Sequence, residues 1–239
     1  MRRSLPALLL GTLLLGGTSC RKDGPEAEEG LSYVNGLPYY HFTSQDQPWL
    51  QAKTGDSWTF ENGRGVRHTY AIQVGQYPQR AYETFAPYGL LGTKYTVVSY
   101  YDETVLSAFS PDTSGTGSGG NFHFYRDATV RPYNEVGTGP SRLYAEGYWG
   151  KFVGNTDLHS DYYSCRGVKF PSGTALNGPF QQLTVRGRTY TDVVAFIGTS
   201  RGPNCQPVSS AYLQEMYYDR QAGLVRLVSL GGEVWDRVP

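Results

Sequence analysis

The sequence predicts an all-β domain built from antiparallel strands, and two observations carry this prediction. Apolar residues recur at every second position through much of the chain, and β-branched and aromatic types dominate these positions. No window keeps an apolar period of 3.6, and the 30 glycines and 14 prolines would interrupt most helices. About ten strands joined by consecutive hairpins indicate a meander that curls into a half-barrel, a closed barrel or a sandwich.

The first nineteen residues have the order of a secretory signal peptide. Arg2 and Arg3 precede an apolar run from Leu5 to Leu15, and small residues follow it. The run is about half the roughly 20 residues that cross a bilayer, so we expect a lipid anchor, palmitate included, rather than a membrane span. An ordinary cleaved signal with a chance cysteine is the alternative. The cleavage region resembles a lipobox, after which the cysteine carries the lipid: Gly17-Thr18-Ser19-Cys20.

Residues 20–36 are polar, acidic and glycine-bearing, and we expect them to form a flexible tether behind the lipidated Cys20. The next residue is Arg21 rather than aspartate, which in the Gram-negative sorting scheme resembles an outer-membrane destination. The acidic stretch after it resembles the surface-export tags of Bacteroidota lipoproteins. Residues 37–239 can bury one substantial core, so we expect a single antiparallel β domain in the cell envelope, either periplasmic or surface-exposed.

The charge balance argues against a nucleic-acid partner. The chain has 21 basic and 21 acidic residues, and loss of Arg2 and Arg3 with the signal peptide leaves an excess of two acidic residues. A sequence-independent nucleic-acid binder needs a basic stripe, which this sequence does not contain.

Two cysteines remain once Cys20 carries lipid. Cys165 and Cys205 form an even pair in an exported chain, so we expect a disulfide between them. It would close a loop of about forty residues and stabilise the fold by about 3 to 4 kcal/mol. Two free buried thiols or a zinc pair are the alternatives, although the histidines supply no further zinc ligands at suitable spacing.

The strands are expected to begin with Val66–Val74, where Tyr70 and Ile72 alternate with polar residues. Asn62-Gly63 before it is a strong hairpin signal. Turns are expected at Gly187, Gly223 and Gly231-Gly232, and loops at Ser110–Gly120 and Thr199–Pro207. The other expected strands are Lys94–Tyr101, Asn121–Arg126, Leu143–Val153, Arg166–Phe170, Phe180–Arg186, Thr189–Ile197, Tyr212–Tyr218, Leu224–Leu230 and Glu233–Val238.

Sequence motifs of the common enzyme classes are absent, and we expect no cofactor. Gly115, Gly117 and Gly120 have the spacing of a dinucleotide fingerprint, but a strand rather than a helix follows them. The sequence has no Walker loop, no nucleophile elbow and no zincin helix. These absences favour a binding protein over an enzyme, although paired carboxylates for glycoside hydrolysis would meet only in space.

A hydrolase or metal-binding protein is the alternative, and it rests on one polar loop. Asp157, His159 and Asp161 are alternate residues, so on an extended segment their side chains would point the same way. A solvated loop is the simpler interpretation, so we assign no metal site. The other histidines are scattered, and any catalytic pair would have to be assembled by the fold.

Three segments carry a resemblance to a known group: Gly55-Asp56-Ser57-Trp58-Thr59-Phe60, a central hairpin over Leu183–Val193, and an ending with Tyr217-Tyr218, Gly223-Leu224-Val225 and Trp235. They resemble small Bacteroidota outer-membrane lipoproteins of unknown function. Asp219-Arg220-Gln221 departs from the small residues usual there, and the Cys165 and Cys205 pair is not general. Such proteins resemble the lipoprotein carriers LolA and LolB, in which a curved antiparallel sheet wraps an apolar hollow. The resemblance implies a half-barrel and transfers no catalytic residue.

A curved open sheet with one apolar face would supply a groove for a ligand. We therefore expect a non-enzymatic domain that binds an apolar or glycan ligand, or an envelope protein, on its concave face. The 20 tyrosines suit sugar stacking, although cross-strand tyrosine pairs are the simpler explanation. A purely structural envelope component is a further alternative. The expected lining residues are Tyr70, Ile72, Tyr95, Val97 and Trp149.

Overall fold

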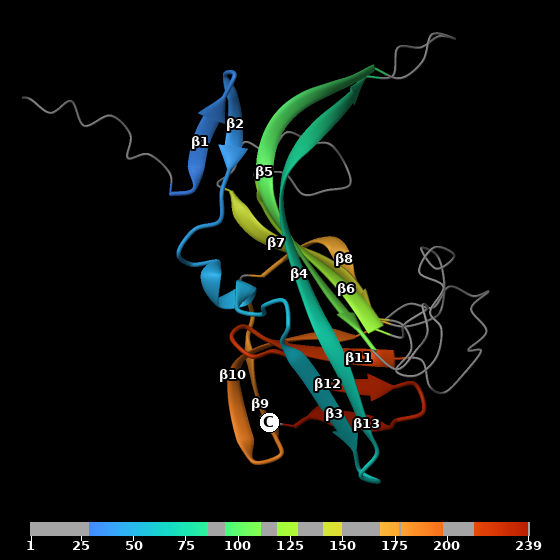
Figure 1. The fold of residues 1–239 in the computed structure, drawn as a ribbon. Helices are drawn as coiled ribbons and strands as arrows, with labels where there is room; N and C mark the ends of the chain where they lie inside the picture. The colour runs from blue at the N-terminus through green and yellow to red at the C-terminus, as the bar shows by residue number, and fades with distance from the viewer. Residues whose placement is uncertain are drawn as a thin grey trace, which may run out of the picture.

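A computed structural model of the chain describes residues 29–85, 94–110, 119–128, 141–149, 168–176, 178–197 and 213–238. These residues form one β-sheet, which confirms the predicted all-β class (Figure 1). Cys20, Cys165, Cys205 and the polar loop with Asp157, His159 and Asp161 lie outside the described residues. Among the described residues, no helix has the length and apolar character of a membrane span.

The described residues contain thirteen strands and one short 3-10 helix, η1, at Gln47–Leu50. Every strand expected from the sequence has a counterpart, and β1, β2 and β3 are additional. The strands are β1 Leu31–Val34, β2 Leu37–Tyr40, β3 Ser57–Asn62, β4 Arg67–Phe85, β5 Lys94–Phe109, β6 Gly119–Asp127, β7 Arg142–Trp149, β8 Val168–Ala175, β9 Gln181–Val185, β10 Arg188–Ile197, β11 Leu213–Asp219, β12 Gly223–Ser229 and β13 Val234–Arg237.

One path of antiparallel pairings joins most of the strands, in the order β8-β7-β6-β5-β4-β3-β13-β12-β11-β10-β9. Most strands of this path pair with their neighbours in sequence; the exceptions are β13, which returns to pair with β3, and β8 and β9, which form the two ends of the path. The hairpin of β1 and β2 lies off this path, and β2 pairs with β5 in parallel. The sheet is open, because its end strands β8 and β9 do not pair with each other over the described residues.

The sheet curls until strands far apart in its order face one another. The rings of Phe122 and Phe124 on β6 lie 5.9 and 5.8 Å from the ring of Tyr218 on β11, centroid to centroid. Trp149 on β7 packs edge-on against Tyr70 on β4 at 4.9 Å. These rings belong to one large buried cluster, so the hollow of the sheet is filled by its own side chains.

Alternation along the strands builds this core. In β3 the side chains of Trp58, Phe60 and Asn62 are buried, and the residues between them are not. Because successive side chains of a strand point to opposite faces, a strand can present one row of side chains to this core. Strands β9, β10 and β12 also form a smaller, separate buried cluster of Val185, Tyr190, Val193 and Val225. Burial of the apolar rows is the main term that favours folding.

The expected turns are present. Arg186 and Gly187 have φ of 49° and 79°, the two positive angles of a type I′ hairpin. The Asn62-Gly63 hairpin also forms, but its positive φ of 77° falls on Gly65, while Asn62 N–H bonds to the Val66 carbonyl, as in a three-residue loop.

Strand β1 and the turn that joins it to β2 lie within residues 20–36, which the sequence predicts as tether. Asn35 and Gly36 have φ of 52° and 79° and join β1 to β2. Asn-Gly is a preferred type I′ turn, so this pair was an available signal that the acidic composition around it concealed.

Strands β4 and β5 extend well beyond the expected limits and form an arm that rises from the rest of the sheet (Figure 1). We define the arm as residues 76–85 and 94–103 together with β1 and β2, and the remaining described strands as the body. A smaller buried cluster of Ala81, Tyr101, Tyr125 and Tyr144 packs where the arm meets β6 and β7. The segment that leads from the arm to η1 is fixed by an ion pair, since Arg126 Nη1 lies 2.9 Å from Asp46 Oδ2.

Candidate functional site

The five residues expected to line a groove do not share one surface. Tyr70, Ile72 and Trp149 are buried in the main core of the body. Tyr95 lies on the arm with 66% of its surface exposed, and its ring contacts Tyr82 rather than the core. Val97 lies two residues further along the same strand.

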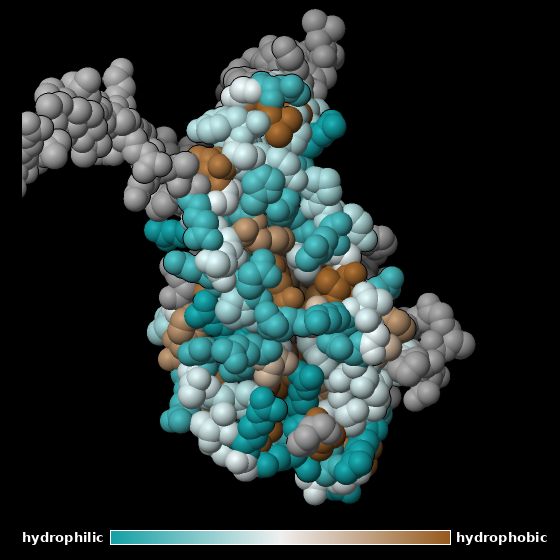
Figure 2. Space-filling model, turned by 60° about the vertical axis from the view of Figure 1, so that its left-hand side comes forward, coloured by the Kyte–Doolittle hydropathy of each residue, from teal (hydrophilic) through white to brown (hydrophobic). Residues whose placement is uncertain are grey.

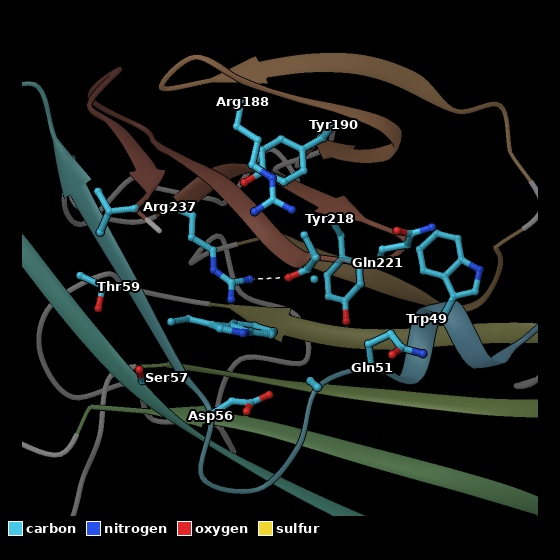
Figure 3. A pocket seen from close by; sticks show the side chains of 15 residues that line it. Trp49, Gln51, Asp56, Ser57, Thr59, Arg188, Tyr190, Tyr218, Gln221 and Arg237 are labelled. Carbon is cyan, nitrogen blue, oxygen red and sulfur yellow. Dashed lines mark hydrogen bonds between the residues drawn. The ribbon is translucent and has the colours of Figure 1, made fainter.

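A pocket of about 490 Å³ opens instead at one end of the body (Figure 3). Its wall combines the segment after η1, the start of β3, the start of β10, the β11–β12 turn and the end of β13. The pocket lies within the size range of small-molecule sites. The lining residues are Trp49, Gln51, Ala52, Asp56, Ser57, Trp58, Thr59, Arg188, Tyr190, Tyr218, Gln221, Ala222, Gly223, Arg237 and Val238.

Two arginine side chains enter this pocket from different strands (Figure 3). The guanidinium carbon of Arg237 lies 5.1 Å from the centre of the Trp58 ring, and that of Arg188 lies 5.0 Å from the centre of the Tyr190 ring. Both distances are those of cation–π contacts. Among the described residues, neither guanidinium forms an ion pair with a carboxylate.

Strand geometry explains these contacts. Arg188 and Tyr190 are alternate residues of β10, so their side chains lie on the same face. Arg237 is paired with Phe60 in the ladder of β13 and β3, and Trp58 is its diagonal neighbour two residues along β3.

The β11–β12 turn supplies the polar wall of the pocket. Asp219 Oδ1 accepts hydrogen bonds from the N–H groups of Gln221 at 3.0 Å and Ala222 at 2.8 Å. The turn held in this way presents the Ala222 carbonyl, which accepts a hydrogen bond from Arg237 Nη1. Of the three residues that depart from the lipoprotein resemblance, Gln221 lines the pocket and Asp219 holds the turn.

Gly223 closes the turn in a conformation that requires glycine. Its φ is 78°, and a Cβ at this position would lie 2.8 Å from Cζ2 of Trp58. The absence of a side chain therefore lets the turn pack directly on the indole that carries Arg237.

The environment of the pocket disfavours the charged form of Arg237. Burial lowers the pKa of the Arg237 guanidinium, and the nearby charge of Arg188 lowers it further, against the opposing influence of Tyr190, Tyr218 and Asp56. Burial also raises the pKa of the Tyr218 hydroxyl, so this group stays a neutral phenol at physiological pH. The Asp56 carboxylate accepts a hydrogen bond from the Lys53 N–H at 2.8 Å.

No short sequence motif marks these pocket residues. All three segments of the lipoprotein resemblance contain pocket residues, among them Trp58, Arg188 and Tyr218, but the resemblance itself points to no pocket. Arg188 and Arg237 are single arginines at the ends of β10 and β13, two strands that β11 and β12 separate in the sheet, so no local pattern places them at one pocket.

No group of three or more histidine, cysteine or acidic side chains in the described ranges is arranged to hold a metal ion. Comparisons of the chain with models of protein families, with curated proteins and with solved structures found no match.

Proposed function

We propose that this protein is a lipid-anchored component of the cell envelope that binds an acidic sugar in the pocket at the end of its sheet. The anchor follows from the signal peptide and Cys20, and the sorting features after it favour the outer membrane. The further proposal that the open sheet is a half-barrel rests on its curvature and on the resemblance to LolA and LolB. Because side chains fill the hollow of this sheet, the ligand would bind at its end rather than inside it.

One observation carries the choice of ligand: two guanidinium groups without a carboxylate partner among the described residues face the same pocket, each over an aromatic ring. Two like charges in a partly buried site repel each other, and a bound anion would relieve this repulsion. Arginine presents a planar fork of donors that matches a carboxylate, so bidentate recognition is available to either residue.

The remaining lining suits a hydroxylated ligand. Trp49, Trp58 and Tyr218 form the floor of the pocket with no more than 3% of their surface exposed, while Gln51 and Gln221 supply amide donors and acceptors for hydroxyl groups. An apolar acyl ligand is less well matched, because charged and amide groups would lose water without gaining partners. On the face shown in Figure 2, hydrophobic residues form separate patches among hydrophilic ones rather than a continuous groove.

The test is calorimetric titration of the full chain in detergent with an oligogalacturonate and with its neutral methyl ester. We expect the acid to bind, the ester to bind at least about tenfold more weakly, and added salt to weaken binding of the acid. Arg188→Gln and Arg237→Gln should each weaken binding of the acid about tenfold, equivalent to about 1.4 kcal/mol.

Arg142→Gln is the matched control, since Arg142 is an exposed arginine on β7 away from the pocket. Equal affinity for acid and ester, or an equal effect of all three substitutions, would contradict the proposal. Binding of a fluorescent fatty-acid probe in place of both sugars would favour the apolar alternative.

A further inference from the structure

In the arm, away from the pocket residues, a serine, a histidine and an aspartate are joined by hydrogen bonds. Ser32 Oγ on β1 lies 2.8 Å from Nε2 of His41, and Nδ1 of the same ring lies 3.1 Å from Oδ2 of Asp102 on β5. A carboxylate only accepts hydrogen bonds, so the contact with Asp102 places the ring proton on Nδ1. His41 Nε2 is then the acceptor, and the Ser32 hydroxyl donates to it.

From this geometry we propose that Ser32, His41 and Asp102 form a serine hydrolase site that cleaves carboxylic esters of small acyl groups. Such sites are recognised by the geometry and roles of the three groups rather than by their order in the chain. The site is independent of the sugar pocket and would add an activity to the binding function.

Tyr39 holds the histidine and the aspartate in place. Its ring stacks on the His41 ring with 4.0 Å between centroids, and its hydroxyl donates to Asp102 Oδ1 at 2.8 Å. Burial and the bond to Asp102 raise the pKa of Tyr39 to about 12, so its hydroxyl remains a donor at neutral pH. Asp102 and Tyr39 are therefore positioning residues that fix the imidazole, whereas Ser32 and His41 would contact the reacting atoms.

The backbone beside Ser32 offers a donor for the oxyanion. His41 N–H bonds to the Gly30 carbonyl, and bonded pairs alternate along an antiparallel hairpin, so Tyr33 opposite Pro38 is a non-bonded pair. Tyr33 N–H then points to the outer edge of β1, which among the described strands pairs only with β2. The N–H of the residue after the nucleophile is a common oxyanion donor.

The reaction balances with water as the only co-reactant. Ser32 Oγ bonds to the ester carbonyl carbon while its proton passes to His41 Nε2, and the carbon–alkoxy bond then breaks as that proton passes to the leaving alcohol. Water next attacks the acyl-serine with His41 again accepting a proton, which releases the carboxylic acid and restores Ser32.

The surroundings of Ser32 favour a small acyl group on an extended substrate. His41 and Asp102 keep 39% and 31% of their side-chain surface exposed, and Tyr33 next to the nucleophile is 68% exposed. The substrate would therefore approach over an open surface, and the exposed ring of Tyr33 offers it an apolar contact.

The test is labelling of the full chain in detergent with a fluorophosphonate, followed by peptide mass spectrometry and by assays with p-nitrophenyl acetate. We expect the label on Ser32, with loss of at least about 100-fold in labelling rate in Ser32→Ala and in His41→Asn. Ser44→Ala, which removes an exposed loop serine, and Arg142→Gln, which removes an exposed arginine of the body, should leave the rate unchanged.

Asp102→Asn tests positioning, and we expect it to lower kcat while KM stays within about twofold. Labelling of the wild-type chain tests the hydrolase proposal even if a variant does not fold. Absence of label in the wild-type chain, label at another residue, or labelling that survives His41→Asn would each overturn the proposal. If the wild-type chain is labelled at Ser32 but does not bind the oligogalacturonate, only the proposed function of the pocket is refuted.

Discussion

The body and the arm of this molecule are held together by different means. The body closes around fully buried rings such as Trp149, Phe60 and Phe122, and the contact of Phe60 on β3 with Trp149 on β7 joins strands far apart in the sheet. The arm buries only a small cluster and relies on side-chain hydrogen bonds, with exposed tyrosines along its surface. The body therefore supplies rigidity, and the arm keeps polar groups accessible for chemistry.

The most severe test of this contrast is to truncate one ring in each region. Trp149→Ala should cost about 3 to 5 kcal/mol of unfolding free energy, because it leaves a cavity among Tyr70, Phe60 and Phe122. Tyr95→Ala in the arm removes a side chain that is 66% exposed and should change stability by no more than about 0.5 kcal/mol. Urea unfolding followed by circular dichroism measures both, and similar losses would remove the distinction between the regions.

The same contrast explains which parts of the fold were predictable. In the body, alternating apolar residues and turn glycines predicted each strand from β6 onward and the hairpins at Gly187, Gly223 and Gly232. These signals are local, because the side-chain period and the turn angles involve only adjacent residues.

The arm was less predictable, because its strands continue through residues that normally end a strand. Gly75 and Pro78 lie within β4, whereas the expected strand stopped at Val74. Beyond Ala71, β4 pairs only with β5, so it has an open edge where the N–H that proline lacks is not required. Sequence pattern shows the proline but not the open edge.

Neither candidate site could be found from local sequence. His41 and Asp102 are 61 positions apart, and the parallel pairing of β2 with β5 is what brings them together. Arg188 and Arg237 lie on β10 and β13, which β11 and β12 separate in the sheet, and they line one pocket only in the folded chain. Neither group of residues forms a short sequence motif.

The space around two turn glycines, one in the body and one in the arm, tests how tightly the body is packed. Gly223 and Gly36 have nearly the same positive φ, but a Cβ would meet Trp58 at Gly223 and nothing within 4 Å at Gly36. Gly36→Ala in the arm should cost about 1 to 2 kcal/mol from backbone conformation alone. Gly223→Ala should cost about 1 to 3 kcal/mol more, because Trp58 must move.

Gly187→Ala is the control within the body, since Gly187 has φ of 79° and open space around it. It should match Gly36→Ala in thermal unfolding experiments. An equally large loss at Gly187 and Gly223 would show that the turn angle, and not the packing on Trp58, sets the cost.

The smallest predicted effect concerns His123, at the boundary between body and arm. Its Nδ1 lies 3.0 Å from Oε1 of Glu103, whose other oxygen accepts a hydrogen bond from Gln79 Nε2 at 2.8 Å. The bond to Glu103 raises the pKa of His123, and the charges of Glu103 and Glu146 act in the same direction, while burial opposes them. Protonation of this histidine therefore stabilises the folded state.

This stabilisation is fully present below the ordinary histidine pKa of about 6.5 and is lost as the pH rises through the raised value in the folded chain. We expect His123→Gln to lower the unfolding free energy by up to about 1 kcal/mol near pH 5.5, and the deficit to shrink toward zero near pH 9. In a Glu103→Gln background the same substitution should lose most of its pH dependence, because the group that raises the pKa is gone. A deficit that is constant with pH, or larger at alkaline pH, would contradict the ion pair and would leave packing of the ring as the reason for any effect.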